Sequence, residues 1–403
     1  MPRASQILMI TMGLETNPVL CNADSDAHAS PVPPARTVGH IPSLDGIRAL
    51  SFLLVFLSHA GLGDLVPGGF GVTVFFFLSG FLITTLMRVE FESSGAVSLR
   101  RFYLRRALRI LPPFFVILAA AALVTELLVP RLVTAPALLA QSFDLTNYWI
   151  ILHGYVGQPF GAGVYWSLAV EEHFYLLFPL LYIAMQRRGL RPSQQARLLW
   201  SMCLLVLLWR CVLVFVFHVT SNRTYLGTDT RIDSILFGCA LAVWRNPALD
   251  ILPRSFDERR FRWAILPAAV GALLICLLFR NHEFRQTIRY TIEGMALTFL
   301  FTAAIRYSHW PLFRFLNWKP VAFVGVLSYS LYLVHLCVLQ SIQHAFPRLS
   351  PWPLGAVGLA VSLCIAWAIY ELIEKPCARA RKRLTVSVDI PAERKAAPLS
   401  ATR

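Results

Sequence analysis

Arg48 and His59 are two ionisable residues within one apolar segment, and their spacing places them on the same face of a helix. Eleven residues separate them, which is about three helical turns plus about 20°, and about 16 Å along the axis. Ionisable side chains inside a membrane span are costly and are usually functional. The pair therefore predicts a fixed cation at one depth and a titratable base at another. The alternative is structural: Arg48 reaches the interface and pairs with Asp45, while His59 is a packing residue.

A second polar cluster opens the apolar segment that begins near residue 111. Arg105 and Arg106 precede Arg109 by four and three residues, so the three side chains gather on one side of a helix start. Guanidinium groups bind phosphates bidentately, which predicts an anion site here. The alternative is a simple anchor on the cytoplasmic side of a membrane.

A third cluster is the pair Glu171 and Glu172, near the end of another apolar segment. Two adjacent carboxylates cannot both face lipid, so at least one is expected to face a polar cavity or a cation. The alternative is a purely structural ion pair. Weaker signals come from Arg231 and Asp233 at the end of another apolar segment, and from Tyr332 and His335 within the segment 321–341.

The composition requires a membrane around the elements that position these residues. Of 403 residues, 56% are hydrophobic and only 15% are charged, whereas a soluble domain carries about 25% charged residues.

The net charge of +15 does not indicate nucleic-acid binding, because the basic residues accompany the ends of apolar segments and no nucleic-acid-binding motif surrounds them. The eight cysteines form no CxxC pair and no Cys/His cluster, so we expect neither a metal site nor a disulfide framework.

The apolar segments predict an all-α polytopic membrane protein with ten transmembrane helices. With the N-terminus inside, the inward segments hold 29 of the 37 lysines and arginines, which favours ten spans with both termini cytoplasmic. We expect a flexible cytoplasmic tail over 1–40, a membrane domain over 41–376 and a basic cytoplasmic tail over 377–403. The predicted spans are 45–62, 70–88, 111–129, 166–186, 198–219, 231–246, 262–280, 288–306, 321–341 and 353–374.

From about residue 44 to 383 the chain resembles acyltransferase family 3, the membrane-bound O-acyltransferases that modify bacterial surface carbohydrates. Its Arg/Lys-x10-His signature falls on Arg48 and His59, and its Arg-x-x-Arg signature falls on Arg106 and Arg109. His173 stands where the family often has Gln. The segments that carry the resemblance, in order, are 44–50, 71–83, 102–110, 166–175, 231–233, 327–335 and 374–376.

The resemblance implies transfer of an acyl group, with acetyl the first expectation, from cytoplasmic acyl-CoA to a hydroxyl of an extracytoplasmic carbohydrate such as O-antigen or exopolysaccharide. It implies His59 as general base, assisted by Glu171 or Glu172. Acyl-CoA is a co-substrate, and no permanently bound cofactor is expected. The residues implied at the acyl-CoA end are Arg48, Arg106, Arg109 and Ser79, and those at the acceptor end are Arg231, Asp233, Tyr332 and His335.

Several alternatives remain open at this stage. The acceptor could be a macrolide or another small glycosylated product. A transporter of lipid-linked sugars would also explain many spans and buried charges, although the two halves show no clear inverted repeat. A non-catalytic membrane scaffold is the third alternative. Longer members of the family carry a hydrolase-like domain after the last span, which leaves acceptor handling here either to the membrane domain itself or to a separate extracytoplasmic partner protein. We expect the chain in the bacterial inner membrane.

Overall fold

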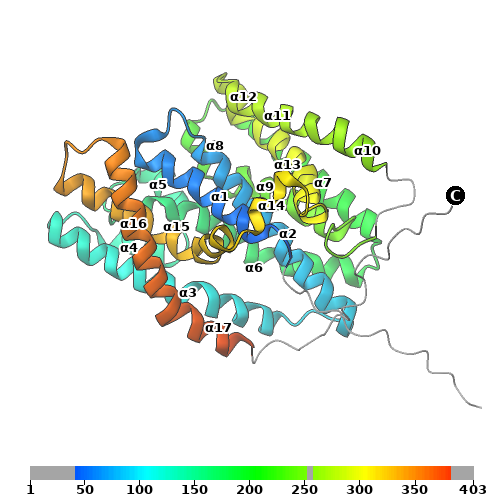
Figure 1. Ribbon diagram of the computed structural model, residues 1–403, viewed down its shortest axis with the longest axis horizontal. Coiled ribbons are helices and arrows are strands. Elements are labelled where there is room, and N and C mark those ends of the chain that lie inside the picture. Colours follow the sequence, from blue (N-terminus) through cyan, green and yellow to red (C-terminus); the bar gives the residue numbers. More distant parts are fainter. Residues whose placement is uncertain (1–40, 252–256, 383–403) are drawn as a thin grey trace, which may run out of the picture. The chain divides into compact units, whose positions relative to one another are not determined.

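A computed structural model describes residues 41–251 and 257–382, and every regular element within these ranges is a helix (Figure 1). The all-α prediction is therefore confirmed. The predicted tail 1–40 lies outside the described residues, as does the second tail beyond residue 382. Residues 377–382, which we assigned to that tail, instead continue a helix, α17 (Lys375–Lys382).

A helix covers each of the ten predicted spans, and eight helical stretches are long and apolar enough to cross a membrane. The chain is thus a multi-pass membrane protein, while the ten-span count stays a prediction. The long helices are α1 (Leu44–Leu57), α2 (Gly68–Ser94), α3 (Leu99–Leu128), α6 (Trp166–Arg187), α7 (Pro192–Phe215), α9 (Thr228–Val243), α11 (Leu266–Leu278), α13 (Arg289–Arg306), α15 (Lys319–Ala345) and α16 (Pro351–Ile369). The short ones are α4 (Ala135–Ser142), α5 (Thr146–His153), α8 (Ser221–Leu226), α10 (Glu258–Arg260), α12 (His282–Gln286) and α14 (Pro311–Arg314).

The two predicted spans outside the group of eight are α9 and α13. Helix α9 packs against α2, α7 and α13, and all but one of its residues from Thr230 to Val243 are buried. Because protein rather than lipid surrounds α9, its charged residues do not meet hydrocarbon, and its hydropathy is low for that reason.

Helices α2 and α9 approach each other closely through two glycines. A Cβ atom on Gly80 would lie 2.0 Å from the carbonyl oxygen of Ile235, and one on Gly238 would lie 2.0 Å from that of Phe77. Small residues at helix contacts let backbones pack closely, which is a main source of helix association in membranes. Since α2 carries Ser79 and α9 carries Arg231, this contact fixes the relative depth of two expected site residues.

Helix α1 changes its geometry near His59. The α-helix ends at Leu57, and Ser58–Leu62 continues as a wider π turn that contains Gly61 in a left-handed conformation, with φ of 96°. Such π turns often occur at functional sites. Leu57 and Ser58 keep right-handed helical backbone angles, and the departure from helical geometry comes at Gly61, after His59.

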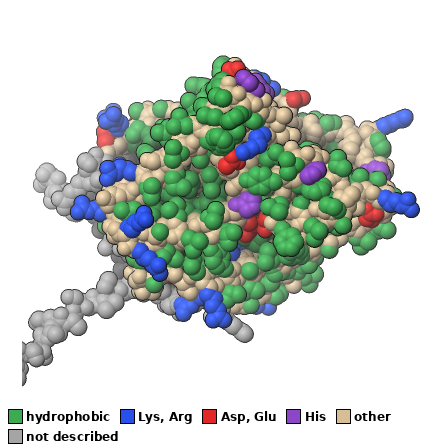
Figure 2. All heavy atoms as spheres, turned by 180° about the vertical axis from the view of Figure 1, so that it is seen from behind, with side chains coloured by type: hydrophobic (Ala, Val, Ile, Leu, Met, Phe, Trp, Pro, Cys, Tyr) green, Lys and Arg blue, Asp and Glu red, His purple; other side chains and the backbone are tan. Residues whose placement is uncertain are grey.

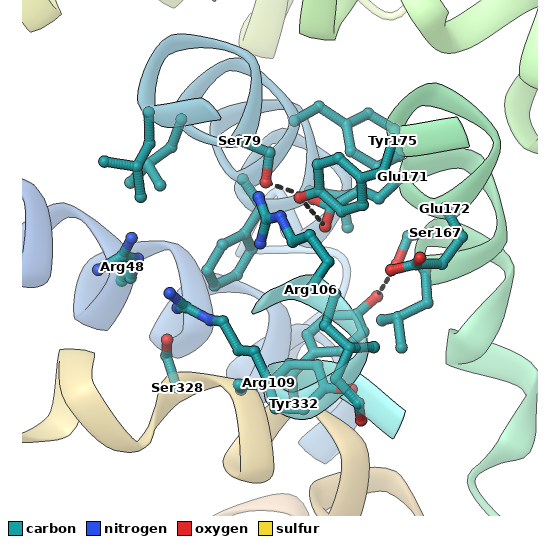
Figure 3. Close-up of a pocket in the computed structure, with 18 residues that line it drawn as sticks. Arg48, Ser79, Arg106, Arg109, Ser167, Glu171, Glu172, Tyr175, Ser328 and Tyr332 are labelled. Atoms are coloured by element: carbon teal, nitrogen blue, oxygen red, sulfur yellow. Dashed lines mark hydrogen bonds between the residues drawn. The ribbon is translucent and has the colours of Figure 1, made fainter. Parts of the chain in front are cut away.

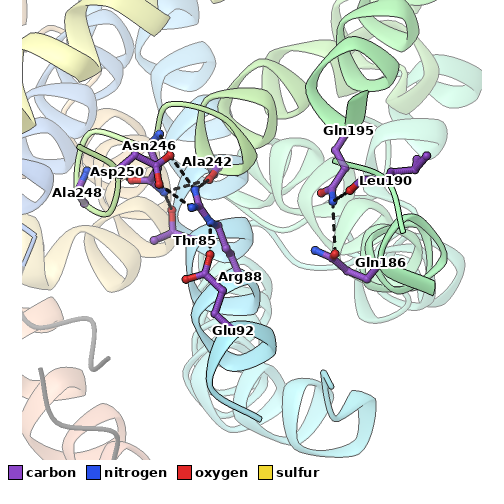
Figure 4. A network of polar contacts seen from close by, with 10 residues as sticks. All are labelled: Thr85, Arg88, Glu92, Gln186, Leu190, Gln195, Ala242, Asn246, Ala248 and Asp250. Carbon is purple, nitrogen blue, oxygen red and sulfur yellow. Dashed lines mark hydrogen bonds and ion pairs between the residues drawn. The ribbon is translucent and has the colours of Figure 1, made fainter. Parts of the chain in front are cut away.

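The far end of α2 is held by a polar network around Arg88 (Figure 4). The Arg88 guanidinium donates to Asp250 at 2.6 and 2.9 Å and to Glu92 at 2.7 Å. Asn246 donates to the hydroxyl of Thr85 at 2.8 Å in the same network. These contacts join α2 to the segment after α9 and give the α2–α9 pair a second attachment.

The surface agrees with a membrane location. Figure 2 shows a face that is covered largely by hydrophobic side chains, with lysine and arginine side chains mainly towards its margins. Large apolar side chains remain exposed along several helices, for example Leu123, Leu127 and Leu205 at 62%, 73% and 64% exposure. A water-soluble protein rarely shows such contiguous apolar surface, whereas lipid would cover it.

Candidate active site

Helices α1, α2, α3, α6 and α15 surround a cavity of about 790 Å³ (Figure 3). We call it the cationic cavity, because three arginines line it: Arg48 from α1, and Arg106 and Arg109 from α3. The sequence segments that supply the lining lie far apart in the chain, yet they are the same segments that carried the predicted chemistry. The polar residues that complete the lining are Ser79, Ser167, Glu171, Glu172, Tyr175, Ser328, Tyr329 and Tyr332.

The three arginines leave hydrogen-bond donors free in the cavity. Arg48 is paired with Asp45 at 2.5 Å, as the structural alternative predicted, but it also lines the cavity. The Arg106 guanidinium lies 4.0 Å from the centre of the Tyr175 ring, and its buried Nε has no hydrogen-bond partner in the described part of the chain. Arg109 points towards the same space as Arg48 (Figure 3) and has no acceptor among the described residues. Three like charges with open donors favour a bound anion.

Arg105, by contrast, is turned away from this group. Its Nη2 donates to Glu90 on α2 at 2.7 Å, and it does not line the cavity. The three-arginine cluster that we expected at the start of α3 is therefore divided: Arg106 and Arg109 face the cavity, and Arg48 of α1 supplies the third cation.

The two adjacent glutamates both line the cationic cavity, but neither contacts His59 in the part of the chain that the structure describes. Glu171 accepts hydrogen bonds from the hydroxyl groups of Ser79, at 2.9 Å, and Tyr175, at 3.1 Å. Ser79, which we expected to bind acyl-CoA, is thus held by Glu171. These carboxylates partly balance the arginines instead of orienting the imidazole.

Tyr332 stands at the end of the cavity that lies along α15. Its hydroxyl forms a 2.7 Å hydrogen bond with that of Ser167 and also lies 3.1 Å from the carbonyl oxygen of Val164. The Phe75 ring packs edge-on against the Tyr332 ring, with 5.9 Å between centroids. One helical turn further along α15 is His335, whose ring centre is 5.6 Å from that of Tyr332.

His335 contacts His59 directly: Nε2 of His335 lies 3.1 Å from Nδ1 of His59. The other nitrogen of His335, Nδ1, lies 2.8 Å from the carbonyl oxygen of Tyr332 and 3.2 Å from that of Leu331. Carbonyl oxygens only accept, so Nδ1 of neutral His335 carries the proton and its Nε2 accepts one from His59 Nδ1. This chain of hydrogen bonds leaves Nε2 of His59 unprotonated and able to act as a base.

The two histidines differ in exposure. His335 is fully buried, whereas His59 is exposed on the described protein. We expected His335 at the acceptor end of the site. In the structure His335 contacts His59, and its ring also packs against those of Phe52, Phe56 and Tyr332, of which Tyr332 lines the cavity.

Comparison with known proteins identifies the family. Residues 41–371 match a family model that is described as an acyltransferase domain. The chain belongs to acyltransferase family 3.

Two curated relatives are similar to this acyltransferase domain. The peptidoglycan O-acetyltransferase OatA of Listeria monocytogenes is 27% identical over 353 residues, which cover 84% of this chain and 56% of that protein. The O-acetyltransferase OatA of Staphylococcus aureus is 30% identical over 356 residues, which cover 84% and 57%. The chain thus spans a little more than half the length of these relatives. No solved structure matches it significantly.

Within the acyltransferase domain, neither Arg231 nor Asp233 lines the cationic cavity. Asp233 is paired with Arg210 at 2.7 Å, and both side chains are fully buried. Arg231 is also fully buried, with its guanidinium 4.0 Å from the centre of the Tyr290 ring and within 5.7 Å of three further rings, those of Phe76, Trp166 and Tyr225. We expected both residues at the acceptor end. Helix α9 is enclosed by other helices, so both side chains are buried in the protein interior, and their place relative to the acceptor stays a prediction.

Some cavity residues were not among those that we selected from the sequence. Ser167 and Tyr175 lie four residues before and four residues after Glu171, so the three form one stripe on α6. That spacing was a usable signal. No sequence signal indicated the pairing of Arg210 with Asp233, because it depends on how α7 packs against α9.

Proposed function

We propose that this protein is an integral membrane O-acyltransferase that moves an acyl group, in the first instance acetyl, from acyl-CoA to a carbohydrate hydroxyl outside the cytoplasm. The observation that carries the proposal is the arrangement along α15: the cationic cavity ends at Tyr332, and the His335–His59 pair begins one helical turn further on. An anion site and a base therefore lie next to each other.

The donor suits the cationic cavity by charge. Acyl-CoA is a polyanion with phosphate groups at one end and a thioester at the end of a long arm. Arg106 and Arg109, with Arg48 beside them, offer the guanidinium donors that phosphates prefer. We propose that the phosphates bind there and that the arm extends along α15 past Tyr332 towards His59.

The reaction then needs only a base and a leaving group. Nε2 of His59 accepts the proton of the acceptor hydroxyl as the hydroxyl oxygen attacks the thioester carbonyl. The carbon–sulfur bond breaks, and the departing thiolate of CoA takes the proton from His59. A positioned base of this kind contributes about 10²–10⁴-fold to the rate. The products are the carbohydrate ester and CoA.

The relatives support acetyl as the acyl group and a carbohydrate as the acceptor, because their names describe O-acetyltransferases, one of them acting on peptidoglycan. The many membrane helices support action at a membrane, which we place in the inner membrane of a bacterium.

Replacing His59 by Ala tests the proposal. We expect the transfer of radiolabelled acetyl from acetyl-CoA to fall at least about 10²-fold, while the full chain in lipid nanodiscs still binds CoA. His309→Ala is the matched control, because His309 is exposed and far from the cavity lining, and its activity should stay near that of the unaltered protein. Substantial acetyl transfer by the His59→Ala variant would refute the role of His59 as the general base. If the unaltered protein does not consume acetyl-CoA, the alternative function, a transporter of lipid-linked sugars, would be favoured instead.

A further inference from the structure

A second cavity, of about 1140 Å³, is lined by residues on both sides of His59 in the chain, while His59 itself lines neither cavity. Ser58, the residue before His59, lines it, as do residues 66–70 at the start of α2. The cationic cavity is lined by later residues of α2, from Val72 to Leu82. The remaining walls of the second cavity come from α8, from the end of α11 with the Arg280 that follows it, from α12, which contacts α8, and from the start of α13.

The wall between the two cavities is aromatic and carries the buried Arg231. Phe76 lines the cationic cavity, whereas Tyr225 and Tyr290 line the second, and all three rings face the Arg231 guanidinium. Two ligands could therefore occupy the two cavities at once, one on each side of this wall, and Ser58, next to His59 in the chain, lines the second of them.

Three arginines line the second cavity, and no aspartate or glutamate does. Arg285 is exposed and has no partner within the described ranges. Arg280 donates only to a backbone carbonyl, that of Asp64, at 3.1 Å. Arg289 donates to the Tyr290 hydroxyl at 2.9 Å and is paired at 3.7 Å with Glu293, a buried residue that does not line the cavity. Such a group of guanidinium donors without a lining carboxylate selects for carboxylate or phosphate groups on a ligand.

We propose that the second cavity binds the acceptor, and that the acceptor is an anionic carbohydrate bearing carboxylate or phosphate groups. This inference rests on the proposed function, since it needs a hydroxyl to be presented to His59. The arginines bind the negative groups, and the Tyr225 and Tyr290 rings offer amphipathic surfaces of the kind that sugar rings contact.

Binding of three hexasaccharides of equal length to the full chain in nanodiscs tests this inference. The probes are neutral maltohexaose, hexagalacturonate with its carboxylates, and a phosphorylated maltohexaose. We expect at least one anionic probe to bind at least about tenfold more tightly than the neutral one, the effect of one charge-assisted hydrogen bond. The preference between carboxylate and phosphate would identify which anionic group the acceptor carries.

The single variant Arg285→Gln should weaken binding of that anionic probe by about tenfold. The double variant Arg280→Gln/Arg285→Gln should weaken it by more than tenfold. CoA binding should be unchanged in both. Arg348→Gln is the matched control, because Arg348 is equally exposed and does not line the cavity; it should bind like the unaltered protein.

Equal binding of the charged and neutral probes, no binding of any probe, or an equal effect of Arg348→Gln would overturn the inference. So would a loss of CoA binding in Arg285→Gln, since that would assign the second cavity to the donor. None of these outcomes affects the acetyl-transfer result for His59→Ala. The acceptor assignment can therefore be refuted while the proposed function is supported.

Discussion

At the scale of single residues, His335 is the group that determines which nitrogen of His59 is free. The backbone of α15 fixes the proton on His335 Nδ1, and the 3.1 Å contact then fixes the proton on His59 Nδ1. Replacing His335 by Leu removes the acceptor and frees the imidazole to rotate and to change tautomer. We expect kcat to fall by roughly tenfold to 10²-fold, which is part of what a general base contributes. Acetyl transfer measured at saturating acetyl-CoA checks this.

The conservative variant His335→Gln separates orientation from packing. The side-chain carbonyl of Gln can accept from His59 Nδ1, so this variant should recover much of the rate that His335→Leu loses. Equal activity of the two variants would mean that His335 acts only by filling space. A dependence of kcat on pH that differs between Leu and Gln at this position would support the positioning role.

Arg109 and Arg105 provide an internal comparison, because they lie one helical turn apart on α3 with different surroundings. Arg109 faces the cationic cavity, whereas Arg105 is paired with Glu90 outside it. Arg109→Gln should weaken CoA binding by about tenfold or more, as expected for a lost charge-assisted hydrogen bond, and Arg105→Gln should leave it nearly unchanged. Calorimetric titration with CoA measures both. Equal affinities of the two variants for CoA would mean that the CoA phosphates do not bind in the cationic cavity.

At the scale of helices, the contact between α2 and α9 limits what the chain can tolerate. In Gly238→Ala the new methyl group would meet the carbonyl oxygen of Phe77 at 2.0 Å, and a backbone atom cannot move aside. We expect a loss of about 3 kcal/mol in stability, at the upper end of the usual cost of overpacking. Gly271→Ala in α11 is the control, because no atom lies within 4 Å of its added Cβ. Its stability should rise by up to about 1 kcal/mol. Thermal unfolding in nanodiscs distinguishes them, and similar midpoints would contradict the close contact.

Periodicity and charge within one helix were sufficient to select some of the site. Arg48, Arg106 and Arg109 lie in the cationic cavity, as do Glu171, Glu172, Ser79 and Tyr332. Contacts between helices were not predictable in the same way. The pairing of His59 with His335 depends on how α1 packs against α15. Asp233 looked like a site residue because a charge in an apolar segment is costly, but Arg210 of another helix satisfies it.

At the scale of the whole molecule, the number of membrane crossings depends on α9 and α13, which are too short or too polar to be recognised by hydropathy. If both cross the membrane, residue 258 is cytoplasmic and residue 283 is extracytoplasmic. If neither crosses, α11 runs in the opposite direction and the two positions exchange sides. The 29 inward lysines and arginines favour the first arrangement. The same arrangement places the second cavity, with Arg285, on the outer side, where a carbohydrate acceptor would be.

Single cysteines at these two positions decide between the arrangements, because Glu258 and Glu283 are both exposed. In a variant without the native cysteines, we expect Glu283→Cys to react with a membrane-impermeant maleimide in intact spheroplasts and Glu258→Cys to react only after lysis. The reverse pattern would contradict the ten-span arrangement with both termini cytoplasmic and would place the second cavity on the cytoplasmic side. An acceptor outside the cytoplasm could not reach it there, so this experiment constrains the acceptor assignment without any assay of transfer.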